Sequence, residues 1–314
     1  MLVILNPESR GGAGRGLRPE IERALDARGV TCRIVSTTAP GTATVLARDA
    51  AVAGEDVVVS AGGDGTAHEV ANGLLQAADA GAGQAALGLI PIGTGNDFVK
   101  VIPGTSTRRT AYDTLARGQR FPYDAGRVSW PGGGEYFLNA MGTGIDVEVV
   151  RQILTRSRRT GRLVYIGGLV RALRRYRPVH LRLELEGETM ELRVMTIAVA
   201  NGTCIGGLFR ICPAARPDDG LLDLCVVAQL GFTRIPGMAL KLINGRHEGH
   251  PAVAFRKVSL ARIRVLDHSP LFFQLDGELR EPAGVHELEV TVQAGRLPVI
   301  AADAARDAPS CIVE

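Results

Sequence analysis

Apolar segments alternate with helical patterns through the first 118 residues of the chain. The predicted strands lie at 2–5, 31–35, 56–60 and 86–90. Valine-rich runs such as 56–60 are typical of strands buried on both faces of a parallel sheet. Apolar positions with helical spacing predict helices at about 17–28, 42–53 and from 66 onward. The alternation predicts an α/β domain with a doubly wound parallel sheet.

From Phe121 the pattern changes to short strands separated by turn residues. The predicted strands are 121–128, 135–141, 179–186, 191–200, 221–227, 252–265 and 272–275. Long helices are rare in this half, so it predicts an antiparallel β-sandwich. We therefore expect two domains, at 1–122 and 123–294.

The segment 55–73 combines a predicted strand, a glycine turn and a predicted helix. A turn of this kind directs backbone N–H groups outward at a helix N-terminus, where they can bind a phosphate. Glycine lets the phosphate approach the backbone, and some positions are expected to need positive φ. Asp64 would repel a phosphate unless a metal ion lay between them. The alternative is an ordinary strand-to-helix turn.

A second glycine-rich turn at 91–98 follows the next predicted strand. Phe98 stands where a dinucleotide-binding fingerprint has its third glycine, so a Rossmann site is a weak match. The basic loop at 8–16 is either a third phosphate-facing loop or a surface loop. The hydroxyls at 36–38 are expected to cap the helix that follows, with ligand contact as the alternative.

Composition limits the class of protein. Hydrophobic residues make up 46% and charged residues 22% of the 314 residues, which describes a globular chain. The net charge of +3 does not indicate nucleic acid as a partner. The five scattered cysteines contain no CxxC, which predicts reduced thiols and no metal site. There is no signal peptide and no apolar run of the ~18 residues that span a membrane. We expect a cytoplasmic protein.

The segment 151–177 carries nine arginines and no acidic residue around an apolar centre. It is either a domain helix with a solvated basic side or a surface for anionic lipid head groups. The second interpretation predicts peripheral association with a membrane.

The ordered motifs resemble the diacylglycerol kinase catalytic-domain family, which includes bacterial lipid kinases and, more distantly, sphingosine and ceramide kinases. They are Asn6-Pro7, GGDGT at 62–66, PIGTGNDF at 91–98, DAG at 124–126, FLNAMGTGID at 137–146, VANG at 199–202, ARPDDGLLD at 215–223 and DGE at 276–278. NAD kinases and phosphofructokinases share the GGDG turn, so the resemblance implies their kind of N-terminal fold. It also implies that the chain returns to the first domain at 295–314.

The resemblance implies an ATP site on the first domain. The implied contacts are Asn6, Thr37, Gly62, Gly63, Asp64, Gly65, Thr66, Ala67, His68 and Thr94. Bacterial relatives commonly have Asn where this chain has His68, so that contact differs from the family pattern.

The resemblance further implies Mg²⁺ bound by the Asp219 carboxylate with the backbone carbonyls of Arg216 and Leu221. On their own, Asp218-Asp219-Gly220 would be interpreted as a plain turn. Glu278 is implied as the general base for the lipid hydroxyl, and Asp64 as the carrier of the nucleotide's Mg²⁺ or, alternatively, as the base.

These observations give the hypothesis of an ATP-dependent lipid kinase acting on diacylglycerol or a similar hydroxyl lipid, in phospholipid biosynthesis. One alternative is a soluble-substrate kinase of NAD-kinase type. The other is a catalytically silent regulator that binds lipid or nucleotide. The homodimeric state is left open.

Overall fold

The chain divides into two compact units. The computed structural model describes residues 1–154, 178–267 and 270–303. The first unit comprises Met1–Tyr123 and the segment that begins at Gly295, and the second comprises Asp124–Ala294. Each unit has its own hydrophobic core.

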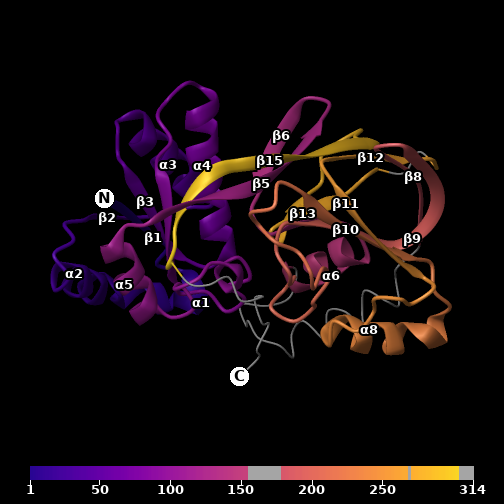
Figure 1. Cartoon of the computed structure of the whole chain (residues 1–314), viewed down its shortest axis with the longest axis horizontal. Helices are drawn as coiled ribbons and strands as arrows, with labels where there is room; N and C mark the ends of the chain where they lie inside the picture. The colour runs from indigo at the N-terminus through magenta and orange to yellow at the C-terminus, as the bar shows by residue number, and fades with distance from the viewer. Residues whose placement is uncertain (155–177, 268–269, 304–314) are drawn as a thin grey trace. The chain divides into compact units, whose positions relative to one another are not determined.

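A parallel sheet forms the centre of the first unit (Figure 1). Its strands are β1 (Leu2–Leu5), β2 (Arg33–Ser36), β3 (Val57–Gly62) and β4 (Ala86–Pro91), in the order β4-β3-β1-β2. Its helices are α1 (Ser9–Gly12), α2 (Arg18–Asp26), α3 (Thr42–Val52), α4 (Asp64–Asp79) and α5 (Arg108–Arg117), with 3₁₀ turns η1 (Ala13–Gly16) and η2 (Val99–Val101).

Helices cover both faces of this sheet, which confirms the prediction of a doubly wound fold. Val3 and Val59 face one core, into which Ile21 of α2 and Leu115 of α5 also pack. Helices α3 and α4 pack against each other and contact β1 and β3. Because β2 and β3 lie on opposite sides of β1, the connections that leave β1 and β3 run toward opposite edges of the sheet, and the strand order reverses between these two strands. Ligands of open α/β sheets bind at the carboxyl ends of strands at such a reversal.

The second unit is built from antiparallel strands. They are β5 (Arg120–Trp130), β6 (Gly133–Phe137), β7 (Ala140–Gly144), β8 (Val179–Leu185), β9 (Glu188–Ala200), β10 (Leu222–Ala228), β11 (Val253–Val258), β12 (Leu260–Val265), β13 (Phe273–Leu275), β14 (Glu278–Arg280) and β15 (Glu287–Ile300). Strands β14, β13, β7, β9, β8, β12 and β15 lie side by side in that order, β10 pairs with β9 and β11, and β5 pairs with β6. The predicted antiparallel β-sandwich is confirmed.

Strand β10 is buried on both faces. Leu222, Leu224 and Val226 pack into the sandwich core. Cys225 and Val227 point into a second core with residues of α6 (Ile145–Leu154) and α8 (Ile235–Ile243). The second unit therefore has a helical layer on the outer face of β9 and β10. The short η3 turn (Phe232–Arg234) precedes α8.

Two predicted strands of the second half are each divided in the structure. The segment 135–141 contains the end of β6 and the start of β7, with a break at Leu138-Asn139. The segment 252–265 forms β11 and β12, which are separated at Ser259. Apolar periodicity continues through both breaks, so it could not locate them. Strand β15 returns to the first unit, where Val299 pairs in parallel with Leu87 of β4.

The predicted hydroxyl cap of α3 is wrong. Its N-cap is Gly41, in the left-handed conformation with φ 82°, and makes no side-chain capping bond. Instead, the carboxylate of Glu69 on α4 accepts the N–H groups of Gly41 at 2.8 Å and Ala43 at 3.0 Å. An anion at a helix N-terminus stabilises the helix dipole, so α4 supplies the cap of α3.

Other sequence expectations have mixed outcomes. Cys32, Cys212 and Cys225 are free thiols, as expected for these three residues. The basic segment 151–177 lies outside the described residues from 155 onward. Within the described part of the chain, no helix is long and apolar enough to cross a bilayer.

We expect Glu69→Ala to lower the free energy of unfolding by about 1–2 kcal/mol, because two N–H groups at the start of α3 lose their acceptor. Glu22→Ala is the matched control. Glu22 is exposed on α2 and, among the described residues, pairs with Arg18 four residues away, so its loss is expected to cost no more than about 0.5 kcal/mol. Urea denaturation followed by circular dichroism measures both. Equal stabilities of the two variants would contradict the cap.

Candidate functional site

The turn after β3 is shorter than the sequence predicts. Strand β3 runs to Gly62 and α4 begins at Asp64, so Gly63 alone connects them. The N–H groups of Asp64, Gly65 and Thr66 therefore belong to the first turn of a 16-residue helix. The first N–H groups of a helix have no partner within it, and together with the helix dipole they favour a bound phosphate.

The glycines of this turn are required for packing. None of Gly62, Gly63 and Gly65 has a positive φ, so that expectation is wrong. A Cβ at Gly62 would lie 2.3 Å from Oγ1 of Thr66. A Cβ at Gly93, in the second glycine-rich turn, would lie 2.5 Å from Cα of Gly63. The two turns touch backbone to backbone, and a side chain at these positions would separate them.

Asp64 joins the same two turns. Its Oδ1 accepts the N–H of Phe98 at 3.3 Å. Its Oδ2 lies beside Gly95, where a Cβ would come within 2.8 Å. The carboxylate is thus held at the N-terminus of α4, next to the groups predicted to bind phosphate. A divalent ion bound there would neutralise both charges, so this position is compatible with the predicted Mg²⁺.

The carboxyl ends of β1 and β3 lie side by side at the point where the strand order reverses. Nδ2 of Asn6, which follows β1, donates to Oγ1 of Thr66 at 3.0 Å. Thr37, which follows β2, donates its N–H to the carbonyl of Leu5 at 2.9 Å. The structure therefore brings Asn6, Thr37 and the 62–66 turn together at the carboxyl edge of the sheet.

The remaining predicted nucleotide contacts differ in exposure. Ala67 is 4% exposed and His68 is 2% exposed, with its ring Nε2 3.4 Å from Nδ2 of Asn72. Thr94 is exposed on the second turn. A direct contact between His68 and a nucleotide stays a prediction, and its burial gives it a packing role in α4.

Two glycine-rich segments differ from their predicted form. The turn at 91–98 leads into the three-residue η2, and α5 begins only at Arg108, so this turn presents no α-helix N-terminus. The basic loop at 8–16 folds into α1 and η1, with Arg15 paired to Glu8. Gly14 packs on Asn6, since a Cβ at Gly14 would lie 2.2 Å from the carbonyl oxygen of Asn6.

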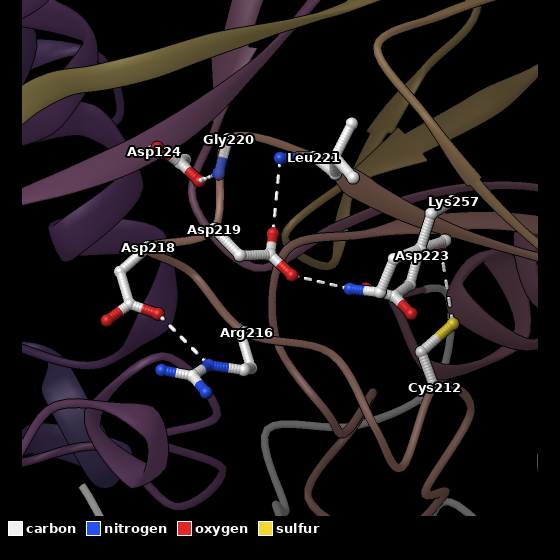
Figure 2. Close-up of polar contacts among 9 residues, drawn as sticks. All are labelled: Asp124, Cys212, Arg216, Asp218, Asp219, Gly220, Leu221, Asp223 and Lys257. Carbon is white, nitrogen blue, oxygen red and sulfur yellow. Dashed lines mark hydrogen bonds and ion pairs between the residues drawn. The ribbon is translucent and has the colours of Figure 1, made fainter.

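In the second unit, the 215–223 loop is anchored by Asp124. Oδ2 of Asp124 accepts the N–H of Gly220 at 2.7 Å, and the N–H of Asp124 donates to the carbonyl of Pro217 at 2.7 Å. Figure 2 shows Asp218 directed to Arg216 and Asp219 directed to Lys257. The Oδ1 of Asp219 also accepts the N–H of Leu221 at 3.2 Å.

Glu278 lies at the start of β14 on a turn that Asp276 fixes. The Asp276 carboxylate accepts three N–H groups, those of Leu138, Asn139 and Ala140, at 2.8–3.0 Å. Asp276 itself has a φ of 51°, in the left-handed region. Glu278 is exposed. The turn therefore presents a carboxylate to solvent from a rigid base, which suits a proton acceptor.

Asn201 connects the 215–223 loop with this turn. Its Nδ2 donates to the carbonyls of Asp124 at 2.8 Å and Leu138 at 2.9 Å. Asp124 holds the loop and Leu138 bonds to Asp276, so the VANG, DAG and DGE motifs form one network in the second unit. The motifs are visible in the sequence, but the roles of Asn201 and Asp276 are not, because side-chain-to-backbone bonds between distant segments leave no local pattern.

An apolar cavity lies between α6, β9, α8 and the segment 205–211. The space that a water-sized sphere can occupy in it is about 70 Å³, and Asp146 and Thr196 are the polar residues among those described in its wall. Oγ1 of Thr196 donates to Oδ1 of Asp146 at 3.3 Å. Burial raises the pKa of Asp146 to about 6. The cavity was not predicted from the sequence, in which its only local signal is Asp146 within the largely apolar stretch 140–150.

Gln274 connects the cavity with the Glu278 turn. Its Oε1 accepts the N–H of Gly277 at 2.7 Å, and its Nε2 lies 3.5 Å from Oδ2 of Asp146. Gln274 is 1% exposed. One buried side chain thus spans the distance between the polar wall of the cavity and the residue preceding Glu278.

Family comparisons cover nearly the whole chain. The diacylglycerol kinase catalytic domain matches residues 1–128, and the YegS C-terminal NAD kinase beta sandwich-like domain matches residues 139–301. A diacylglycerol kinase of Bacillus subtilis (strain 168) is 28% identical over 279 residues, covering 88% of each chain. One of Staphylococcus aureus (strain Newman) is 26% identical over 290 residues, covering 91% of this chain and 89% of that protein.

Solved structures show the same fold. A crystal structure of a diacylglycerol kinase from Bacillus anthracis str. Sterne aligns with a TM-score of 0.71 at 22% identity, covering 96% of both chains. A second structure from the same organism aligns with a TM-score of 0.76 at 24% identity and the same coverage.

Asp276→Ala is expected to lower the free energy of unfolding by about 3 kcal/mol or more, since three buried N–H groups lose a charged acceptor. Asp276→Asn is the matched variant. Asparagine tolerates the same left-handed backbone and keeps one acceptor oxygen, so this variant should lose less free energy of unfolding than Asp276→Ala. Thermal unfolding followed by the fluorescence of Trp130 measures both. An Asp276→Asn protein as stable as the wild type would assign the loss in Asp276→Ala to the backbone conformation and not to the charged acceptor.

Asp146→Asn is expected to stabilise the protein at neutral pH. The folded-state pKa of about 6 exceeds the unfolded value near ~3.9, so ionising Asp146 costs stability as pH rises through this interval. The gain should be absent below about pH 4 and reach at most about 3 kcal/mol above about pH 6. Urea midpoints of both proteins from pH 4 to 8 measure it, with exposed Asp26→Asn as control. A gain that does not change with pH would contradict this assignment.

Proposed function

Because the chain belongs to the diacylglycerol kinase catalytic-domain family, with a YegS-like C-terminal domain, we propose that it is an ATP-dependent lipid kinase. It transfers the γ-phosphate of ATP to the hydroxyl of diacylglycerol or a similar lipid. Membership makes the chain a kinase of this family; the lipid acceptor is the proposed part. The relatives from Bacillus and Staphylococcus are named diacylglycerol kinases, which favours diacylglycerol over phosphatidylglycerol.

The observation that carries the lipid assignment is the apolar cavity of the second unit. The described residues of its wall are apolar except for Asp146 and Thr196. An acyl chain would bury apolar surface there, at about 0.8 kcal/mol per CH₂. A soluble acceptor such as NAD would leave its many polar groups without partners in such a cavity.

The polar wall of the cavity orients the lipid toward Glu278. With a pKa of about 6, Asp146 can donate as an acid or accept as a carboxylate near neutral pH, so it suits the polar end of a glycerolipid. Gln274 ties Asp146 to Gly277, the neighbour of Glu278. In this proposal the lipid hydroxyl lies at the exposed carboxylate of Glu278, and the bonds of Gln274 support it.

The nucleotide binds on the first unit at the reversal of the sheet. Its phosphates lie on the N–H groups of Asp64, Gly65 and Thr66, and Asn6 and Thr37 border the same edge. Asp64 would hold the Mg²⁺ of the nucleotide, which when bound supplies positive charge to the phosphates.

Glu278 accepts the proton of the lipid hydroxyl while the oxygen of that hydroxyl attacks the γ-phosphorus. The new O–P bond forms while the bond between the γ-phosphorus and the β–γ bridging oxygen breaks, and ADP leaves. Transfer depends mainly on positioning and on neutralising phosphate charge. Asp64 is the alternative base, but its Oδ1 is engaged by the N–H of Phe98, whereas Glu278 is exposed.

The lipid is reached from the water side of an anionic membrane through the basic segment 151–177. If about five of its arginines face the bilayer at about 1 kcal/mol each, the attraction suffices for transient docking. The support for this step is the sequence, since residues 155–177 lie outside the described part of the chain.

Glu278→Gln is expected to lower kcat by about 10²–10⁴-fold with little change in KM for ATP, because it removes proton transfer and leaves binding. Exposed Glu248→Gln is the control. Transfer of label from ATP is measured to vesicles of diacylglycerol or phosphatidylglycerol in anionic lipid, to NAD, and without acceptor. Transfer to NAD alone would overturn the lipid assignment, and transfer to no acceptor would favour a silent regulator.

Ala239→Phe tests the cavity in the same assay. Ala239 lines the cavity from α8, whereas its neighbour Leu240 is 60% exposed. Filling the cavity should raise KM for diacylglycerol at least ~10-fold, the cost of about two displaced CH₂ groups, and leave KM for ATP unchanged. Leu240→Phe should change neither. Equal KM values for both variants would place the acyl chain elsewhere.

A further inference from the structure

Lys257 occupies the position of a cation in the 215–223 loop. It lies on β11 directly opposite Asp223 of β10 in the antiparallel register. Its Nζ is 2.5 Å from Oδ2 of Asp219 and 3.3 Å from Oδ2 of Asp223 (Figure 2). The ammonium thus bridges a carboxylate of the loop and a carboxylate of the strand into which the loop runs.

Both oxygens of Asp219 are engaged by protein groups. Oδ2 faces Lys257 and Oδ1 accepts the N–H of Leu221 at 3.2 Å. Asp223 is the more buried partner, with its side chain 10% exposed against 25% for Asp219. A buried carboxylate needs a paired charge, and the register of β10 and β11 supplies one.

The predicted Mg²⁺ does not fit this arrangement. Magnesium requires oxygen ligands at about 2.0–2.1 Å in near-octahedral geometry and gives up its waters reluctantly. Its carboxylate ligand would be Asp219, whose Oδ2 is already 2.5 Å from an ammonium. A divalent ion on that carboxylate would repel the ammonium strongly at such a distance, so one of the two cations has to leave.

The loop is also held without any cation. Asp124 binds both Gly220 and Pro217, and Gly220 adopts a φ of 75° that suits the turn. Cys212 donates from Sγ to the carbonyl of Asp223 at 3.4 Å. These bonds place Asp219 within reach of Lys257, so the ion pair forms between groups that the fold has already ordered and costs little side-chain entropy.

We propose that the Lys257 ammonium is the resident cation of the 215–223 loop and replaces the divalent metal that the motif would otherwise bind. The loop then keeps its conformation at any Mg²⁺ concentration, and the protein needs Mg²⁺ only with its nucleotide. This proposal does not depend on the identity of the lipid.

The test uses the full chain without ATP or lipid, and compares Lys257→Met with Lys241→Met. Lys241 is exposed on α8 and serves as the matched control. Thermal unfolding in EDTA and in 10 mM Mg²⁺ is followed by the fluorescence of Trp130, the single tryptophan, which lies in the second unit. Binding of Mn²⁺ is measured by electron paramagnetic resonance.

The wild type and Lys241→Met should have the same Tm in EDTA and in Mg²⁺, within about 1 °C. Lys257→Met should unfold at a lower Tm in EDTA, recover by several degrees in Mg²⁺, and bind Mn²⁺ at least ~10-fold more tightly than the wild type. Adding Asp219→Asn should abolish the gain in Mn²⁺ binding, which separates this loop from Asp64. Lys257→Arg, which keeps the cation, should behave as the wild type.

A wild type that binds one Mn²⁺ through Asp219 and loses Tm in EDTA would overturn the proposal. So would a Lys257→Met protein whose Tm and Mn²⁺ binding equal those of the wild type. Neither result would bear on phosphate transfer to lipid, which the kinase assay measures separately.

Discussion

The arrangement of the second unit depends on one carboxylate. Asp276 accepts the N–H groups of three consecutive residues at the junction of β6 and β7, where strand pairing is interrupted and these groups would otherwise be buried without partners. The same side chain fixes the backbone that carries Glu278. Through Leu138 and Asn201 it is connected to Asp124 and the 215–223 loop. These hydrogen bonds connect residues that are far apart in the sequence into one network.

The periodicity of apolar residues was sufficient to predict the fold class, but not to locate the breaks between consecutive strands. The apolar runs that form β1, β3 and β4 are buried on both faces, so their patterns predict a parallel sheet directly. Strand β10 has the same apolar character, although it lies in an antiparallel unit, because α6 and α8 cover its outer face. The break at Leu138-Asn139 was missed because its cause, Asp276, lies more than a hundred residues away.

Some residues of the candidate site could be predicted from the sequence and others could not. The glycine turn, Asn6 and Thr66 were predicted from motif order, and the structure brings them together. Lys257 could not be predicted, because its partner Asp223 is set by the register of two strands that are more than thirty residues apart. The cavity around Asp146 could not be predicted either, since its walls come from α6, β9 and α8. The local sequence indicates the chemistry of a residue, whereas strand register and packing determine which residues it contacts.

The close contact of the two glycine turns has an evolutionary consequence. A Cβ at Gly62 or Gly93 would collide with Thr66 or with the backbone of Gly63, so folding by itself requires glycine at these positions, whether or not a nucleotide binds. Glu278 is exposed, and replacing it would disturb little packing. If Glu278 is the base, as proposed, a descendant that had lost phosphate transfer could keep both glycines after this glutamate had been replaced. The glycine motif alone would then not distinguish active from inactive descendants.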